Sequence, residues 1–150
     1  MIKKQDDRDK CYLDNPNMRG NFLKFIKLAE DNDWSIYVSL YEEEGTRCGE
    51  LDIECQKYSP AEQDFAMYLQ PINNKKVSFA DLIHGFVESY NPVEEALIWS
   101  KESGEYDEKG YPIRVGINGA PYDYHDLYSD MLACKNMAEE LEKIVKEEQI

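Results

Sequence analysis

The chain has 150 residues, of which 42% are hydrophobic and 11 are tyrosines, so it can bury its own core and is too aromatic for a disordered acidic tail. Its 31 acidic and 17 basic residues give a net charge of −14, which disfavours direct nucleic-acid binding because that binding rests on cationic contacts to phosphate. No apolar run reaches the roughly 20 residues that cross a bilayer, and the first ten residues lack the apolar centre of a signal peptide. We therefore expect one cytoplasmic domain over residues 1–150, attracted to basic surfaces and not to membranes.

The cysteines show no CxxC pair, and their spacing to the two histidines is not that of metal ligands. We expect reduced and mostly buried thiols, no metal site and no cofactor; a disulfide or a metal site is the alternative. The cysteines concerned are Cys11, Cys48, Cys55 and Cys134.

Hydrophobic periodicity in the first half predicts one helix and three strands. Residues 1–20 are polar and contain breakers, which indicates a loose N-terminal arm. Apolar residues at i, i+3, i+4 and i+7 predict a helix over about 21–31. A period of two then predicts half-buried strands, and their short connections favour an antiparallel meander. The predicted strands cover 34–41, 50–55 and about 63–70.

The second half is predicted to be helical. Ser78 is a suitable N-cap for a helix that reaches Tyr90, and Asn91-Pro92 begins another. Residues 101–119 are interpreted as a loop that carries function or hides a short strand at 111–115. A last helix from 121 to 148, about 40 Å long, carries a continuous apolar seam. The seam consists of Tyr124, Leu127, Met131, Cys134, Ala138, Leu141 and Val145.

Together these elements predict an α+β fold of order α-β-β-β-α-α-α, with a three-stranded antiparallel meander and the helices packed on one face of the sheet. The chain contains no GxSxG, HExxH or P-loop motif. His84 lies within a predicted helix, and His125 beside Asp126 lacks an evident nucleophile. We therefore assign no catalytic residue and expect a protein that is not an enzyme.

The acidic residues are expected to gather on two surfaces. Glu50, Asp52 and Glu54 share one face of a strand about 6–7 Å apart, close to the spacing of phosphates along a nucleic-acid strand. Tyrosines between the carboxylates could pack on arginine guanidinium groups. The last helix adds a second acidic strip, for which a solvated, solubilising surface is the alternative. The predicted partner-binding residues are Glu50, Asp52, Glu54, Asp64, Tyr37, Tyr41 and Tyr68 from the sheet, and Asp123, Asp126 and Asp130 from the helix.

Three segments between about 30 and 145 carry a resemblance. They are 58–65 (YSPAEQDF), 90–95 (YNPVEE) continuing to Trp99, and GAP at 119–121 continuing to Leu127. In these segments the chain resembles small acidic accessory proteins of prophages and conjugative elements of Gram-positive bacteria. The resemblance implies an inhibitor of host defence of the anti-restriction or anti-CRISPR kind, several of which resemble DNA in charge distribution. It carries over no functional residues.

The resulting hypothesis is a binding protein that occupies the basic nucleic-acid channel of a defence nuclease, such as a Cas9-type effector or a restriction enzyme. In this hypothesis carboxylates replace phosphates, as in a DNA mimic. A structural or regulatory partner protein that forms a homodimer through its C-terminal helix is the alternative. A small enzyme that uses His125 and nearby acids is the third possibility.

Overall fold

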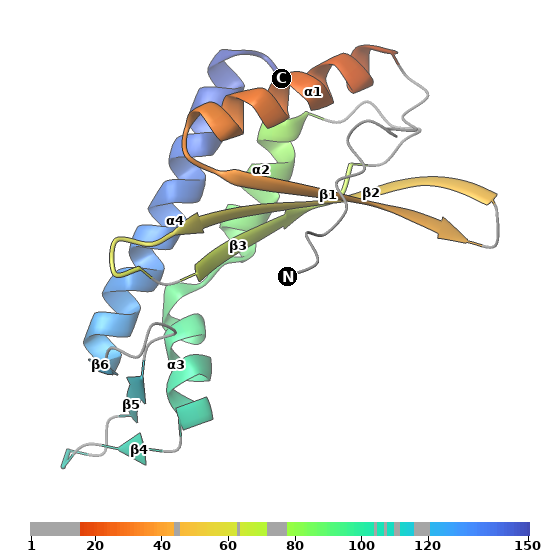
Figure 1. Ribbon diagram of the computed structural model, residues 1–150. Helices are drawn as coiled ribbons and strands as arrows, with labels where there is room; N and C mark the ends of the chain where they lie inside the picture. Colours follow the sequence, from red (N-terminus) through yellow and green to blue (C-terminus); the bar gives the residue numbers. More distant parts are fainter. Residues whose placement is uncertain are drawn as a thin grey trace.

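The computed structural model describes residues 16–43, 46–62, 64–71, 78–103, 105–106, 108–109, 112–115 and 121–150. Side chains are described over 20–39, 52–62, 64–71, 78–98, 108–109 and 126–150. Figure 1 shows a three-stranded sheet with helices gathered on one side of it and a long last helix that runs along the molecule. The predicted α+β class, the three-stranded antiparallel meander and the order of the larger elements are confirmed. In chain order the elements are α1 (Pro16–Asp31), β1 (Ser35–Glu43), β2 (Thr46–Tyr58), β3 (Asp64–Leu69), α2 (Phe79–Ser89), α3 (Pro92–Ser103), β4 (Glu105–Tyr106), β5 (Pro112–Val115), β6 (Pro121–Asp123) and α4 (Tyr124–Glu147).

The main sheet has β2 in the middle, antiparallel to β1 on one side and to β3 on the other. Its register places Glu54 of β2 opposite Tyr37 of β1 and Tyr68 of β3. A register shift between Tyr41 and Glu42 interrupts the pairing of β1 with β2 near their connection. Strand alternation therefore fixes which residues of all three strands share a face.

The buried face of this sheet packs against α1 and α2. The predicted stripe of α1 is fully or almost fully buried, and Phe25 stacks on Phe79 of α2 with ring centroids 5.0 Å apart. Phe79 lies one residue after Ser78, whose hydroxyl accepts the Asp81 amide as the predicted N-cap. The sheet contributes a row of buried side chains to the same core: Ile36, Val38, Ile53, Cys55, Phe65, Met67 and Leu69.

The apolar seam of α4 is covered within the chain. From Leu127 to Val145 every seam residue is buried, and α4 packs chiefly on α2 and α3. The C-terminal part of the seam belongs to the main core, whereas Leu127 and Met131 form a second, smaller cluster with Ala96 of α3. The side chain of Tyr124 lies outside the described residues. The seam prediction is confirmed over the rest of the helix.

The first helix begins earlier than predicted. It starts at Pro16, so the expectation of a loose arm is wrong for 16–20, while residues 1–15 lie outside the described part of the chain. Proline is well suited to the first helical position because its missing N–H would have no intrahelical partner there and its φ angle is already helical. Pro16, one of the residues interpreted as breakers, is therefore the first residue of α1.

The segment before α4 forms a second small sheet that the sequence analysis did not predict. The short strand expected at 111–115 is present as β5, which pairs with β4 on one side and with β6 on the other. The last helix therefore begins at Tyr124 and not at 121, because Pro121–Asp123 is extended and pairs with β5. Within the described ranges, no helix is both long enough and apolar enough to cross a membrane.

Candidate functional site

The face of the main sheet that points away from the helices is the candidate site, and we call it the outer face. Alternation places its residues between the buried ones of each strand. Asp52 is exposed, and Glu54 is half-buried between neighbours on both sides. The described outer face consists of Ser35, Tyr37, Ser39, Asp52, Glu54, Gln56, Tyr58, Asp64, Ala66, Tyr68 and Gln70.

Glu54 lies at the centre of a row that crosses all three strands, with Tyr37 on one side and Tyr68 on the other. A hydrogen bond with the Glu54 carboxylate is the main cause that raises the pKa of Tyr68, followed by partial burial and the negative charge of Glu54. Tyr68 therefore keeps its proton and holds the carboxylate in place. Asp52 lies two residues before Glu54 in β2, and its carboxylate accepts a hydrogen bond from the side-chain amide of Gln70 at 2.5 Å. Gln70 was not predicted as a site residue, although the period of two along the strand predicted at about 63–70 places it on the same face as Asp64 and Tyr68.

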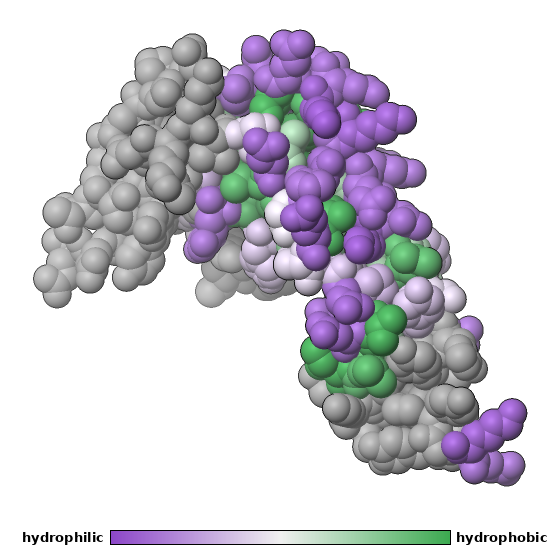
Figure 2. Space-filling view, turned by 180° about the vertical axis from the view of Figure 1, so that it is seen from behind, coloured by the Kyte–Doolittle hydropathy of each residue, from purple (hydrophilic) through white to green (hydrophobic). Residues whose placement is uncertain are grey.

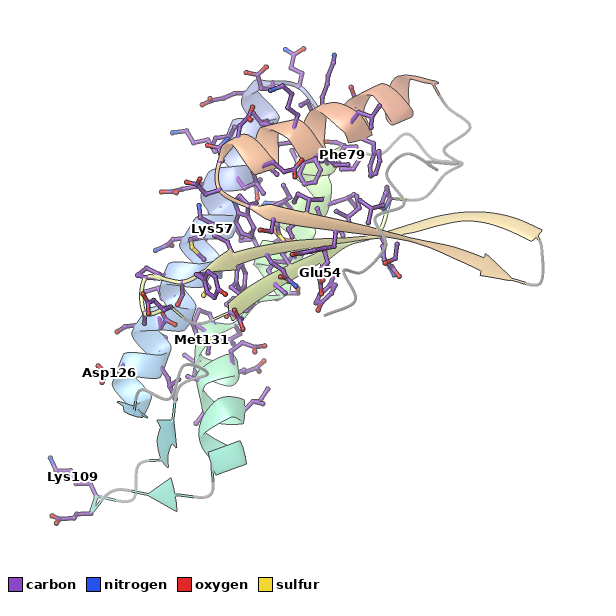
Figure 3. The ribbon with its side chains drawn as sticks, in the orientation of Figure 1. Glu54, Lys57, Phe79, Lys109, Asp126 and Met131 are labelled. Atoms are coloured by element: carbon purple, nitrogen blue, oxygen red, sulfur yellow. The ribbon has the colours of Figure 1, made fainter. Side chains whose placement is uncertain are left out.

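The described outer face carries carboxylates and no basic side chain. Its acids are Asp52, Glu54 and Asp64. The nearest basic residue in β2, Lys57, lies on the opposite face of the strand and is turned towards the connection between α1 and β1. Its Nζ donates to the Asn32 carbonyl at 3.1 Å and lies 5.5 Å from the centre of the Trp34 ring. Figure 3 labels Glu54 and Lys57, which lie three residues apart in β2.

Two further predicted residues continue the outer face in the backbone register. Tyr41 pairs with Glu50, two positions from the Ser39–Asp52 pair. Their side chains lie outside the described residues, so their contribution stays a prediction. Tyr58, which the sequence analysis did not assign to the site, follows the same period of two from Glu54 and is 67% exposed. That period was the available signal for it.

Asp130 is not part of an exposed acidic strip, and its expected exposure is wrong. Its side chain is only 6% exposed. One carboxylate oxygen accepts the hydroxyl of the buried Ser59 at 2.8 Å, and the other accepts the Ala61 amide at 3.3 Å. The connection between β2 and β3 covers this part of α4, so Asp130 joins the helix to that connection.

The remaining acids of α4 are separate from the outer face, because the helix packs mainly on α2 and α3. Asp126 is exposed near the start of the helix, whereas Asp123 lies in β6 with its side chain outside the described residues. Towards the end of α4, exposed acids alternate with exposed Lys143 and Lys146. Figure 2, which views the molecule from behind, shows this hydrophilic surface and a more apolar area near α3, where Val93 and Ile98 are exposed. The helix therefore has the mixed charge of a solvated surface.

His84 forms a bridge between α2 and α4. Its Nδ1 lies 3.1 Å from Glu142 and its Nε2 lies 2.9 Å from Glu88, and the imidazole is 54% exposed. Because carboxylates only accept hydrogen bonds and neutral imidazole has one N–H, protonated histidine satisfies both contacts. The hydrogen bond with Glu142 is the main cause that raises the pKa of His84, followed by the charge of Glu142 and the contacts with Glu88.

The cleft beside His84, of about 680 Å³, is also lined by Ser78 and Lys146. The Ser78 hydroxyl is directed to the backbone as a cap, donating to the Ile150 carbonyl at 3.4 Å. The geometry therefore does not pair this serine with the imidazole, and the His84 bridge serves to join the helices. The side chain of His125 lies outside the described residues. Among the described side chains, no group of three or more His, Cys, Asp or Glu is arranged to hold a metal ion.

Comparison of the chain with protein-family models, with curated proteins and with solved structures gives no match. The seam that suggested dimerisation is covered by α2 and α3 of the same chain, so it does not favour the dimer alternative. The outer face is the surface that combines charge of one sign with exposed aromatic side chains.

Proposed function

We propose that this protein is an inhibitor that binds a basic, nucleic-acid-binding surface of a host defence nuclease through the outer face of its sheet. The observation that carries the proposal is the row of Tyr37, Glu54 and Tyr68, flanked by Asp52 and Asp64, on a described face without a basic residue. The proposed partner is a Cas9-type effector or a restriction enzyme.

Charge supports the choice of partner. A net charge of −14 repels nucleic acid and accelerates encounters with positively charged surfaces. Asp52 and Glu54 lie two strand positions apart, about 6.6 Å, on a rigid sheet. Carboxylates held at a fixed spacing can occupy the lysine and arginine contacts that otherwise bind phosphates.

The tyrosines support binding in contrast to mere solubility. Tyr58 and Tyr68 are 67% and 59% exposed on the same face. Tyrosine supplies a large contact area at a small loss of conformational entropy, and it is enriched at protein interfaces. Carboxylates alone suffice for solubility, whereas exposed aromatic rings add contact area for a partner.

The proposal is tested by measuring DNA cleavage by purified Cas9-type effectors and restriction enzymes with increasing amounts of the protein. We expect inhibition of at least one enzyme at near-stoichiometric concentration, and weaker inhibition when the enzyme is first loaded with DNA. The double substitution Asp52→Lys/Glu54→Lys should raise the inhibitory concentration by at least about tenfold, equivalent to about 1.4 kcal/mol of binding free energy.

The control for net charge is Glu139→Lys/Glu140→Lys on α4, which changes the charge by the same amount at exposed positions. Its inhibitory concentration should stay within about twofold of the unmodified protein. Circular dichroism and thermal melting verify that both variants are folded. Equal loss of inhibition in the two variants, or inhibition of none of the enzymes, would contradict the proposal.

A further inference from the structure

A groove of about 430 Å³ lies at one end of the outer face. Its position follows from the lengths of the side chains in neighbouring rows. The row of Ser35, Gln56 and Ala66 has short side chains at both edges of the sheet. On one side of that row stands Tyr37, and on the other Tyr58 pairs with Asp64. Short residues between larger ones leave a hollow whose walls include two tyrosines.

The groove also has a carboxylate from each of two strand ends. Asp33 precedes β1 and Asp64 begins β3, and both line the groove with exposed side chains. Among the described residues, no hydrogen bond or ion pair engages either carboxylate. Both oxygens of each acid therefore remain accessible to a donor from outside the chain.

The one basic side chain beside the groove is already engaged. Lys57 contributes to the lining, but its ammonium group donates to the Asn32 carbonyl and lies over the Trp34 ring. Two carboxylates against this one ammonium group leave the described lining with a net negative charge beside its tyrosine rings, and Ser35 and Gln56 add neutral polar groups. This combination is complementary to a cation with a flat apolar surface.

We propose that this groove binds the guanidinium group of an arginine side chain supplied by the partner protein. A guanidinium is planar, stacks on a tyrosine ring and donates two parallel hydrogen bonds to one carboxylate, whereas an ammonium group does neither as well. The inference rests on the proposed function, since it assumes a basic partner, and adds the residue type that the partner inserts. Tyr58 supplies the stacking surface and Asp64, its pairing neighbour, accepts the hydrogen bonds.

The test uses N-acetyl-L-arginine methylamide as the probe and nuclear magnetic resonance of the isotope-labelled, full-length protein as the measurement. We expect saturable shifts centred on Tyr37, Tyr58 and Ala66, and at least about fivefold weaker binding of the matching lysine probe. Tyr58→Ala and Asp64→Asn should each weaken binding of the arginine probe at least about threefold. Glu139→Gln on α4, an exposed acid far from the sheet in the chain and outside the groove lining, is the matched control for Asp64→Asn and should leave it unchanged.

Absence of saturable shifts at the groove, equal binding of the lysine probe, or an equal effect of Glu139→Gln would overturn the proposal. The test is separable from that of the proposed function because Asp52 and Glu54 do not line the groove. Nuclease inhibition that survives Tyr58→Ala/Asp64→Asn but is lost in Asp52→Lys/Glu54→Lys would reject the groove and retain the outer face.

Discussion

Replacing Asp130 by alanine removes both hydrogen bonds that join α4 to the connection after β2. The bond from the Ser59 hydroxyl is short, at 2.8 Å, and links residues 71 positions apart in the chain. A hydrogen bond to a charged group stabilises a protein by about 1.5–3 kcal/mol, and the longer bond from the Ala61 amide, at 3.3 Å, should add about 0.5–1 kcal/mol. We therefore expect Asp130→Ala to lower the free energy of unfolding by about 2–4 kcal/mol.

Burial of a carboxylate opposes this contribution, since desolvation of a charge is unfavourable by several kcal/mol. Asp130→Asn separates the two effects, because asparagine keeps an acceptor oxygen and removes the charge. If the charge-assisted bonds outweigh desolvation, Asp130→Asn should also destabilise the protein, by less than the alanine variant. A neutral or stabilising Asp130→Asn would refute the reasoning.

The measurement is urea unfolding followed by tryptophan fluorescence, since Trp34 is buried in the main core. With a slope of about 2 kcal/mol per molar urea, the expected loss shifts the midpoint of Asp130→Ala by about 1–2 M. A double-mutant cycle with Ser59→Ala should give a coupling of about 1–2 kcal/mol, and additivity within 0.3–0.5 kcal/mol would contradict the contact. Glu139→Gln on the exposed side of α4 is the control and should lie within about 0.5 kcal/mol of the unmodified protein.

Three further predictions follow from other contacts. The pKa of His84 is raised above its ordinary value of 6.5. The stabilisation that the protonated imidazole gives is therefore complete below pH 6.5 and is lost as the pH rises through the folded-state pKa. NMR titration should give a His84 pKa above 6.5, and Glu142→Gln should lower that pKa. Burial raises the pKa of the Cys55 and Cys134 thiols to about 12, so, with the other two cysteines replaced by serine, Ellman's reagent at pH 8 should react with the folded protein far more slowly than with the unfolded one. Phe79→Ala removes a fully buried ring that stacks on Phe25 and lies tilted against Phe22. It should lower the unfolding free energy by about 3–5 kcal/mol in urea titration, whereas a loss below about 1 kcal/mol would contradict this packing.

The larger elements were predictable because their periodicity is long and unambiguous. The spacing of Phe22, Phe25, Ile26 and Ala29 identified the buried stripe of α1, and the period of two from Asp52 to Glu54 identified the outer face. The β4–β5–β6 sheet was not predictable as a whole, since strands of two to four residues carry little pattern.

The candidate site was predictable only as far as alternation determines it. Helical spacing gives Asp130 no sign of burial, because the groups that cover it, Ser59 and Ala61, lie 71 and 69 positions away in the chain. The groove at Tyr58 likewise depends on the register of three strands, which places the short side chains of Ser35 and Ala66 on either side of Gln56. Alternation determines which residues share a face, but the exact register also depends on the turns between the strands.

Because α4 is one continuous helix of 24 residues that contributes to two apolar clusters, it joins the main core to the region of α3. The outer face is carried by the main core alone. An opening of α3 and the small sheet would therefore leave the outer face in place, and sequence changes in that region can alter local stability without altering this surface.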